Sequence, residues 1–144
     1  GCFLHYREKE VIIFIMRILN IEDDVIKHSK IARVLEDCRV QEADWAKNLE
    51  EAVHLTEEAA VRGIPYDLVI TDMYYPLTQG GEETEAGLQF IERMREKEPD
   101  LPIVLCSSVR YRMPEIFGTV YYLEHADWEC ELHKLLESLP GKKG

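Results

Sequence analysis

The chain has 144 residues, of which 46% are apolar and 31% charged, with only eight glycines and six prolines. These values fit one globular domain and exclude collagen-like and low-complexity chains. The 28 acidic residues outnumber the 17 lysines and arginines, which gives a net charge of −11. Because such a charge repels phosphate groups, we expect the protein to bind neither nucleic acid nor an anionic membrane surface.

The four cysteines are far apart and show neither a CxxC pair nor a zinc-ligand spacing; they are Cys2, Cys38, Cys106 and Cys130. This pattern predicts reduced thiols in a cytoplasmic protein, with no disulfide framework and no zinc site. The apolar run from Val11 to Met16 is far shorter than the roughly 20 residues that cross a bilayer. The residues before it carry mixed charges and no small-residue cleavage site follows, so a signal peptide is not expected either.

Met16 is a natural start of the domain, which we expect to cover residues 16–140, with a short tail over 141–144. Residues 1–15 are interpreted as an N-terminal extension or an expression remnant. Alternatively, the apolar residues Val11 to Ile15 lengthen the first strand or cover a neighbouring surface.

From Met16 onward, short apolar runs alternate with stretches of helical periodicity, which is typical of βαβ units and a parallel sheet. The predicted strands are Arg17–Ile21, a weak strand at Val40–Asp44, Asp67–Thr71, Leu101–Cys106 and Val120–Leu123. The predicted helices are Val25–Asp37, a helix from the N-cap Asn48 to Gly63, a helix through Leu88 and Met94 that ends before Pro99, and Asp127–Leu139.

Acidic residues follow the first and third predicted strands. Glu22, Asp23 and Asp24 come directly after the first strand, and Asp72 ends the third. The carboxyl ends of parallel strands meet at one edge of the sheet, where open α/β folds bind ligands. Carboxylate and carbonyl oxygens are ligands that Mg²⁺ accepts, so we predict a magnesium site there. The alternative is that these residues only cap the following helices.

Three segments together resemble the receiver domain of two-component response regulators. Residues 17–24 (RILNIEDD) match its first strand and acidic pair, and residues 67–76 (DLVITDMYYP) match its phospho-acceptor strand. Residues 102–107 (PIVLCS) match the strand that ends in the family's hydroxyl residue. The resemblance covers Met16 to about Leu139. It implies an α/β, flavodoxin-like (βα)5 fold, with a doubly wound parallel sheet in the strand order 2-1-3-4-5.

The resemblance also implies a phosphorylation site. Asp72 is the implied phospho-acceptor, and Mg²⁺ is the implied cofactor. The implied metal ligands are Asp23, Asp72 and the backbone carbonyl of Tyr74, with Glu22 acting through water. The chemistry is consistent with these residue types, because phosphoryl transfer to a carboxylate depends on positioning and on charge neutralisation by a divalent ion.

Two further positions match the family's switch, and one departs from it. Ser107 is expected to bind the phosphoryl oxygen and Tyr122 matches the aromatic switch position; otherwise Ser107 caps a helix and Tyr122 is a half-buried strand residue. The family's lysine and proline after the fifth strand are absent, and His125 occupies the lysine position. An unperturbed histidine is mostly neutral at about pH 7. Neighbouring carboxylates could raise the pKa of His125, or Arg110 or Arg112 could supply the cation.

Two segments differ in length from the family pattern. Leu77 to Ala86 is an insertion beside the proposed site, which is either a lid or partner-specificity loop or a solvated insertion. The segment from Ser107 to His125 is short, and Pro114 disfavours a helix in it. The fourth helix of the fold is therefore expected to be shortened, and the partner or dimer geometry is expected to be atypical.

These observations predict a single-domain, CheY-like bacterial receiver whose phosphorylation on Asp72 by a histidine kinase or phosphotransfer protein changes its affinity for an output protein. We expect no enzymatic activity beyond self-phosphorylation and autodephosphorylation. A second copy of the chain, in a homodimer, is a further candidate partner. The alternative is a pseudo-receiver, a constitutive binding module that is not phosphorylated. An aspartate-nucleophile phosphatase is disfavoured because Tyr74 occupies the position of that family's second aspartate.

Overall fold

The computed structural model describes residues 16–40 and 42–139. Five parallel strands form its main sheet in the order β2-β1-β3-β6-β7. They are β1 (Ile18–Ile21), β2 (Asp44–Ala46), β3 (Leu68–Thr71), β6 (Ile103–Ser107) and β7 (Gly118–Tyr121). In chain order this is the arrangement 2-1-3-4-5, so the predicted doubly wound, flavodoxin-like fold is confirmed. The predicted extension over 1–15 and the tail over 141–144 lie outside the described residues.

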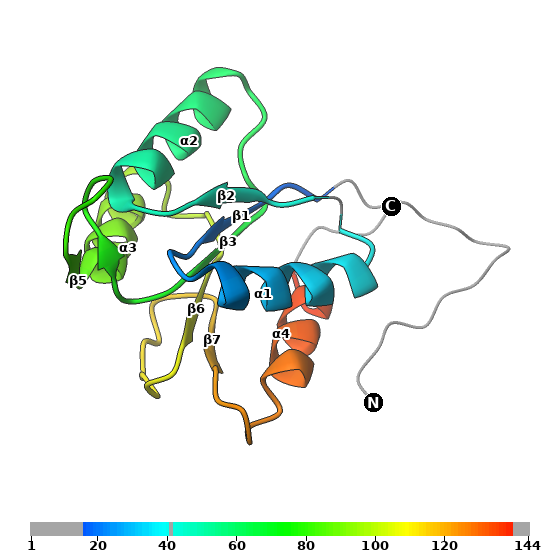
Figure 1. Ribbon diagram of the computed structural model, residues 1–144. Coiled ribbons are helices and arrows are strands. Elements are labelled where there is room, and N and C mark those ends of the chain that lie inside the picture. Colours follow the sequence, from blue (N-terminus) through cyan, green and yellow to red (C-terminus); the bar gives the residue numbers. More distant parts are fainter. Residues whose placement is uncertain (1–15, 41, 140–144) are drawn as a thin grey trace, which may run out of the picture.

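Two helices cover each face of the sheet (Figure 1). On one face lie α1 (Val25–Asp37) and α4 (Trp128–Glu137). On the other lie α2 (Leu49–Val61) and α3 (Ala86–Lys97). None of the helices in the described part of the chain is long and apolar enough to cross a membrane.

Alternate residues of the central strands pack into two separate cores. Ile18 of β1 and Ile70 of β3 belong to the core beneath α1 and α4, whereas Leu19 and Val69 belong to the core beneath α2 and α3. All four residues of β3 are buried, as in a parallel strand that is covered on both faces. Burial on both faces fixes the register of the strands, which sets the positions of the side chains at their carboxyl ends.

The second strand lies further along the chain than predicted. The sequence predicted a strand over Val40–Asp44, whereas the strand β2 is Asp44–Ala46. Val40 instead lies in the turn that follows α1, where its N–H donates to the Leu35 carbonyl at 2.9 Å and its side chain is buried in the core beneath α1. Arg39 adopts a left-handed φ of 61° in this turn, which is a common way to end a helix. The apolar character of Val40 therefore reflects the end of a helix rather than a strand.

The connection between β6 and β7, over the described residues 108–117, contains no helix, so the shortening predicted for the fourth helix goes as far as its replacement by a loop. Residues 108–117 form a loop in which Pro114 lacks the N–H that a regular helix requires. Met113 packs against the core beneath α2 and α3, and the Arg110 guanidinium lies 4.3 Å from the centre of the Tyr121 ring. The loop therefore covers this part of the sheet with side chains in place of a helix.

The inserted segment folds as a small hairpin that leads directly into α3. β4 (Tyr75–Pro76) pairs antiparallel with β5 (Glu83–Thr84). At the start of α3, the N–H of Gly87 donates to the Met73 carbonyl at 2.9 Å. A Cβ atom on Gly87 would lie 2.2 Å from the Asp72 carbonyl oxygen, so only glycine allows this close approach. The first turn of α3 thus packs on the backbone that follows β3.

Candidate functional site

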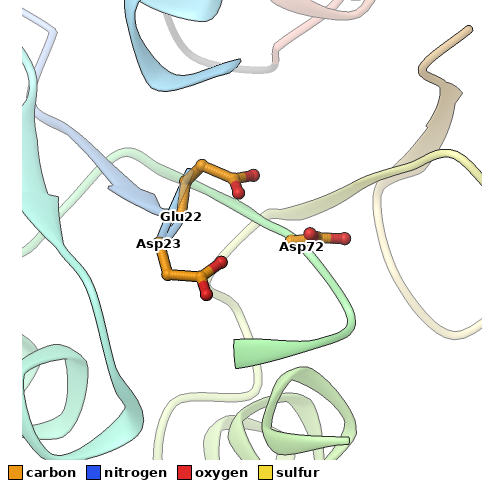
Figure 2. A group of neighbouring side chains, drawn as sticks. All are labelled: Glu22, Asp23 and Asp72. Carbon is orange, nitrogen blue, oxygen red and sulfur yellow. The ribbon is translucent and has the colours of Figure 1, made fainter. Parts of the chain in front are cut away.

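Three carboxylates converge at the carboxyl ends of β1 and β3 (Figure 2). Glu22 and Asp23 directly follow β1, and Asp72 directly follows β3. One oxygen atom from each of the three side chains lies within 4.8 Å of the others. Glu22 is buried, whereas Asp23 and Asp72 are half-buried and reach solvent. The structure therefore brings together the acids that the sequence placed at this edge of the sheet.

Backbone hydrogen bonds between strands hold the acidic residues in place. The N–H of Glu22 donates to the Ala46 carbonyl at 2.9 Å, and the Glu22 carbonyl accepts the Trp45 indole N–H at 2.7 Å. The N–H of Asp72 donates to the Ile21 carbonyl at 3.1 Å. Because the two backbone bonds extend the ladders of β2, β1 and β3, Glu22 and Asp72 are positioned by the sheet rather than by a loop.

Asp24, the third acid after β1, has a different role. Its carboxylate accepts the N–H groups of Ile26 at 2.9 Å and of Lys27 at 3.2 Å, as the N-cap of α1. It does not belong to the group of converging oxygens. The helix-cap alternative therefore applies to Asp24, while Glu22 and Asp23 remain available to the site.

A buried lysine lies beside the carboxylates. Lys27, in the first turn of α1, places its Nζ 3.1 Å from Glu22 Oε1 and 3.3 Å from Asp72 Oδ2. The same ammonium donates to the Cys106 carbonyl at 2.8 Å and lies 4.9 Å from the centre of the Tyr122 ring. Lys27 therefore connects the carboxyl ends of β1, β3 and β6.

Burial and charge shift the pKa values of this cluster. Burial, together with repulsion by Asp72, raises the pKa of Glu22 to about 7, although Lys27 opposes the shift. Burial and the neighbouring Glu83 carboxyl raise the pKa of Asp23 to about 6. Burial alone would lower the pKa of Lys27, but attraction to the surrounding acidic groups outweighs it and raises that pKa. Lys27 is therefore charged at neutral pH, whereas Glu22 is partly protonated when no metal ion is bound.

Ser107 and Tyr122 lie beside each other at the ends of β6 and β7. The N–H of Tyr122 donates to the Ser107 carbonyl at 2.8 Å, and the hydroxyl oxygen of the buried Ser107 accepts the N–H of Val109 at 3.1 Å. The Tyr122 ring packs against Trp128, with 4.8 Å between the ring centres. Because no helix follows Ser107 in the described connection, the alternative that Ser107 caps a helix is wrong.

The three residues expected to replace the family's lysine are exposed. His125 is exposed in the turn between β7 and α4, and Arg112 is exposed in the loop before β7. Arg110 lies over the Tyr121 ring. Within residues 16–40 and 42–139, Lys27 is the basic residue that forms an ion pair with Asp72.

Lys27 is not among the residues predicted from the sequence, although its position on α1 indicates burial. Lys27 lies four residues before Ile31, and both side chains are buried together with Val34 on one face of α1. Residues three or four apart share a helix face, so a lysine at this position points towards the sheet. A lysine is seldom fully buried without a partner, and the acidic run one turn earlier supplies one.

A second polar group beneath the site was also missed. Asn20 of β1 is buried, its amide donates to the Ile70 carbonyl at 2.9 Å, and its Oδ1 lies 2.6 Å from Nδ1 of His28. The His28 ring stacks on Trp45, with ring centres 3.9 Å apart. The Trp45 indole donates to the Glu22 carbonyl. The contacts among Asn20, His28 and Trp45 therefore help to hold the backbone of the buried Glu22 in place.

The donors at this site fit a hard divalent cation. Mg²⁺ binds proteins through one or two carboxylates and keeps several waters, and the half-buried Asp23 and Asp72 offer such ligands. Glu22 Oε1 is buried without a hydrogen-bond partner, although Lys27 is close enough for an ion pair. A water held by a metal ion would supply the missing hydrogen bond.

The chain is similar to proteins of known family and fold. The family model described as response regulator receiver domain matches residues 18–116. The N-terminal domain of a response regulator/sensory box/GGDEF three-domain protein from Carboxydothermus hydrogenoformans is 23% identical, with a TM-score of 0.59 over 84% of this chain and 90% of that chain. The non-phosphorylated HemR receiver domain from Leptospira biflexa is 22% identical, with a TM-score of 0.63 over 90% of this chain and 97% of that chain.

A further similar structure contains a kinase. A chain from the crystal structure of histidine kinase ThkA in complex with response regulator protein TrrA is 25% identical, with a TM-score of 0.62 over 85% of this chain and 99% of that chain. No curated protein matches the chain.

Proposed function

Because the chain belongs to the response regulator receiver domain family of two-component signalling, we propose that it is a phosphorylation-controlled interaction switch whose phospho-acceptor is Asp72. The observation that supports this proposal is the convergence of oxygens from Glu22, Asp23 and Asp72 within 4.8 Å at the carboxyl ends of β1 and β3. The side chain of Asp72 is 19% exposed, so a phosphodonor can reach it.

Mg²⁺ is the proposed cofactor. The proposed protein ligands are Asp23, Asp72 and the backbone carbonyl of Tyr74, and Glu22 acts through a bound water. When bound, a divalent cation neutralises carboxylate and phosphate oxygens and orients them for transfer. The raised pKa values of Glu22 and Asp23 are consistent with this role, because burial without a cation disfavours the ionised carboxylates and the neighbouring Asp72 and Glu83 add to the effect.

In the proposed reaction, a carboxylate oxygen of Asp72 attacks the phosphorus of the donor. The bond from phosphorus to the leaving atom breaks, and its electron pair stays on the imidazole nitrogen of a phosphohistidine or on the acetate of acetyl phosphate. The ionised Asp72 loses no proton. The charge at this residue changes from −1 to roughly −2 at neutral pH.

We further propose that Ser107 and Tyr122 report the phosphorylation. The Ser107 hydroxyl oxygen accepts the Val109 N–H, which leaves the hydroxyl proton available to a phosphoryl oxygen. Because the N–H of Tyr122 donates to the Ser107 carbonyl, a movement of Ser107 would also displace Tyr122. His125 occupies the family's lysine position and is exposed, and the experiment on Lys27 below separates the contributions of the two residues.

The proposed donor is a histidine kinase or a phosphotransfer protein in the cytoplasm, and the proposed readout is a changed affinity for an output protein or for a second copy of the chain. The similar chain in the complex of histidine kinase ThkA with response regulator protein TrrA supports a kinase as donor. No enzymatic activity is proposed beyond gain and loss of the phosphoryl group.

Intact mass spectrometry after incubation with Mg²⁺ and acetyl phosphate tests the acceptor. We expect one added phosphoryl group in the wild-type protein and none in Asp72→Asn, because the amide is not a nucleophile of this kind. Asp100→Asn, a change at an exposed turn residue, is the matched control and should take up phosphoryl normally. Circular dichroism checks that both variants fold. Uptake by Asp72→Asn at the wild-type level would contradict the assignment.

A pseudo-receiver is the second candidate function. It is favoured by the exposed His125 at the family's lysine position and by the absence of a helix between β6 and β7. Its signature would be binding of Mg²⁺ without phosphoryl uptake at any incubation time. Binding of Mg²⁺ can be followed by tryptophan fluorescence, because the Trp45 indole is hydrogen-bonded to the Glu22 carbonyl.

A further inference from the structure

We propose that Lys27, on helix α1, supplies the positive charge that neutralises the phosphoryl group on Asp72. The inference rests on the proposed phosphorylation of Asp72 and names the residue that makes it favourable. The ammonium already lies 3.3 Å from Asp72 Oδ2, the side chain to which the phosphoryl group would be added. A cation at this distance can contact an oxygen of the new group without a rearrangement of the fold.

The charges of the cluster require such a cation. Three ionised carboxylates carry a formal charge of −3, which Lys27 and one divalent ion together bring to zero. Phosphorylation of Asp72 then adds about one further negative charge. Without Lys27 the site would carry two uncompensated negative charges in a partly buried place, where charge interactions are strong.

Because Lys27 is buried, its ammonium is held by the polar groups of this site. The Lys27 side chain is only 8% exposed, so water cannot solvate the ammonium and protein groups must do so. Its partners are Glu22, Asp72 and the Cys106 carbonyl. Glu22 is 1% exposed and its Oε1 lies 3.1 Å from the Lys27 Nζ, which indicates that the pair is built into the site rather than formed on the surface.

The local structure of α1 directs the lysine to this point. The Asp24 carboxylate accepts the N–H of Lys27, which fixes the backbone of the first helical turn. Lys27 shares the buried face of α1 with Ile31 and Val34, so its long side chain extends over the ends of the strands. A lysine on a helix would thus take the role that the resemblance gives to a lysine at the end of the fifth strand.

The initial rate of phosphoryl uptake from acetyl phosphate, measured by intact mass with Mg²⁺ present, tests the proposal. Lys27→Gln removes the charge but keeps a polar side chain, and we expect uptake to be slower by about 100-fold, as for loss of a charge-stabilising donor in an active site. Lys27→Arg keeps the charge and should retain uptake within about tenfold of the wild type. Lys30→Gln, an exposed lysine on the same helix, should leave the rate unchanged.

The outcomes separate this inference from the proposed function. Wild-type rates in Lys27→Gln would overturn the role of Lys27 while leaving Asp72 as acceptor. Loss of uptake in His125→Ala, with normal uptake in Lys27→Gln, would overturn it in favour of His125. No uptake by the wild-type protein would contradict the proposed function itself.

A measurement on the unmutated protein decides the inference even if the substitutions impair folding. Beryllofluoride with Mg²⁺ mimics a phosphoryl group on a carboxylate, and the ¹⁵Nζ resonance of Lys27 reports its contacts. We expect this resonance to shift when beryllofluoride is added to the Mg²⁺-loaded protein. An unchanged Lys27 resonance would overturn the inference.

Discussion

The acidic end of β1 and β3 and the connection from β6 to β7 are built differently. Glu22 and Asp72 follow buried strands and are held by backbone hydrogen bonds to neighbouring strands. Residues 108–117 instead form a loop without a helix, and the receiver-family match ends at residue 116, before β7 begins at Gly118. The family match therefore includes the acids where phosphoryl chemistry is proposed, whereas β7 and α4 lie outside it.

This difference is consistent with the proposal that the positive charge at the acceptor comes from a different element. The turn after β7 exposes His125, whereas the ordered region around β1 and α1 directs Lys27 into the acidic cluster. A cation acts through its position in space and not through its position in the sequence. One part of a receiver can therefore change while the charge required at the acceptor is supplied by another.

Two glycine substitutions sharpen the comparison and carry the largest expected effect on stability. In Gly87→Ala the new methyl group would lie 2.2 Å from the Asp72 carbonyl oxygen, which belongs to fixed backbone. We expect a loss of about 3 kcal/mol or more in the free energy of unfolding, measured by urea denaturation. In Gly118→Ala the nearest atom is Leu135 Cδ2 at 2.6 Å, the end of a flexible side chain. That variant should change stability by only about 1 kcal/mol.

Equal losses in the two glycine variants would contradict the distinction between a rigid acceptor region and an adaptable β7 region. A larger loss of stability in Gly118→Ala than in Gly87→Ala would indicate that the β7 region is the more rigid of the two.

A smaller effect is expected on the stability of the metal-free protein when the pH is changed. The pKa of Glu22 is raised from 4.5 to about 7 and that of Asp23 from 3.8 to about 6. The folded state therefore holds these protons more tightly than the unfolded state, so stability falls as pH rises from about 4 to about 7. Mg²⁺ binds the ionised carboxylates and so removes the loss of stability that their ionisation causes in the metal-free protein. Its addition should raise the melting temperature more at about pH 8 than at about pH 5.

Glu22→Gln provides the control for this titration, because a neutral amide at the buried position should flatten the pH dependence. A Mg²⁺ effect on the melting temperature that is equal at the two pH values, or larger at the lower one, would contradict the account.

The acids of the site could be predicted from the sequence because two simple patterns converge on them. Apolar runs mark β1 and β3, and the rule that parallel strands present ligand sites at their carboxyl ends brings Glu22, Asp23 and Asp72 together. The cap role of Asp24 could not be separated from metal binding, because both uses place an acid between a strand and a helix.

The rest of the site depends on contacts between distant segments. Lys27 pairs with Asp72, 45 positions later, and its burial depends on how α1 packs on the sheet. The hairpin of β4 and β5 has strands of two residues each, which are too short to show an alternating pattern. Val40 was assigned to a strand because a single buried residue after a helix has no periodicity that distinguishes it from one.

The most direct test of the central claim is to locate the phosphoryl group on the chain. Borohydride reduces an acyl phosphate on aspartate to homoserine, which peptide mass spectrometry assigns to a position. After incubation of the wild-type protein with Mg²⁺ and acetyl phosphate, the account predicts homoserine at position 72 and a strong reduction of the signal in Lys27→Gln. Homoserine at another aspartate, or none in a protein that binds Mg²⁺, would contradict it.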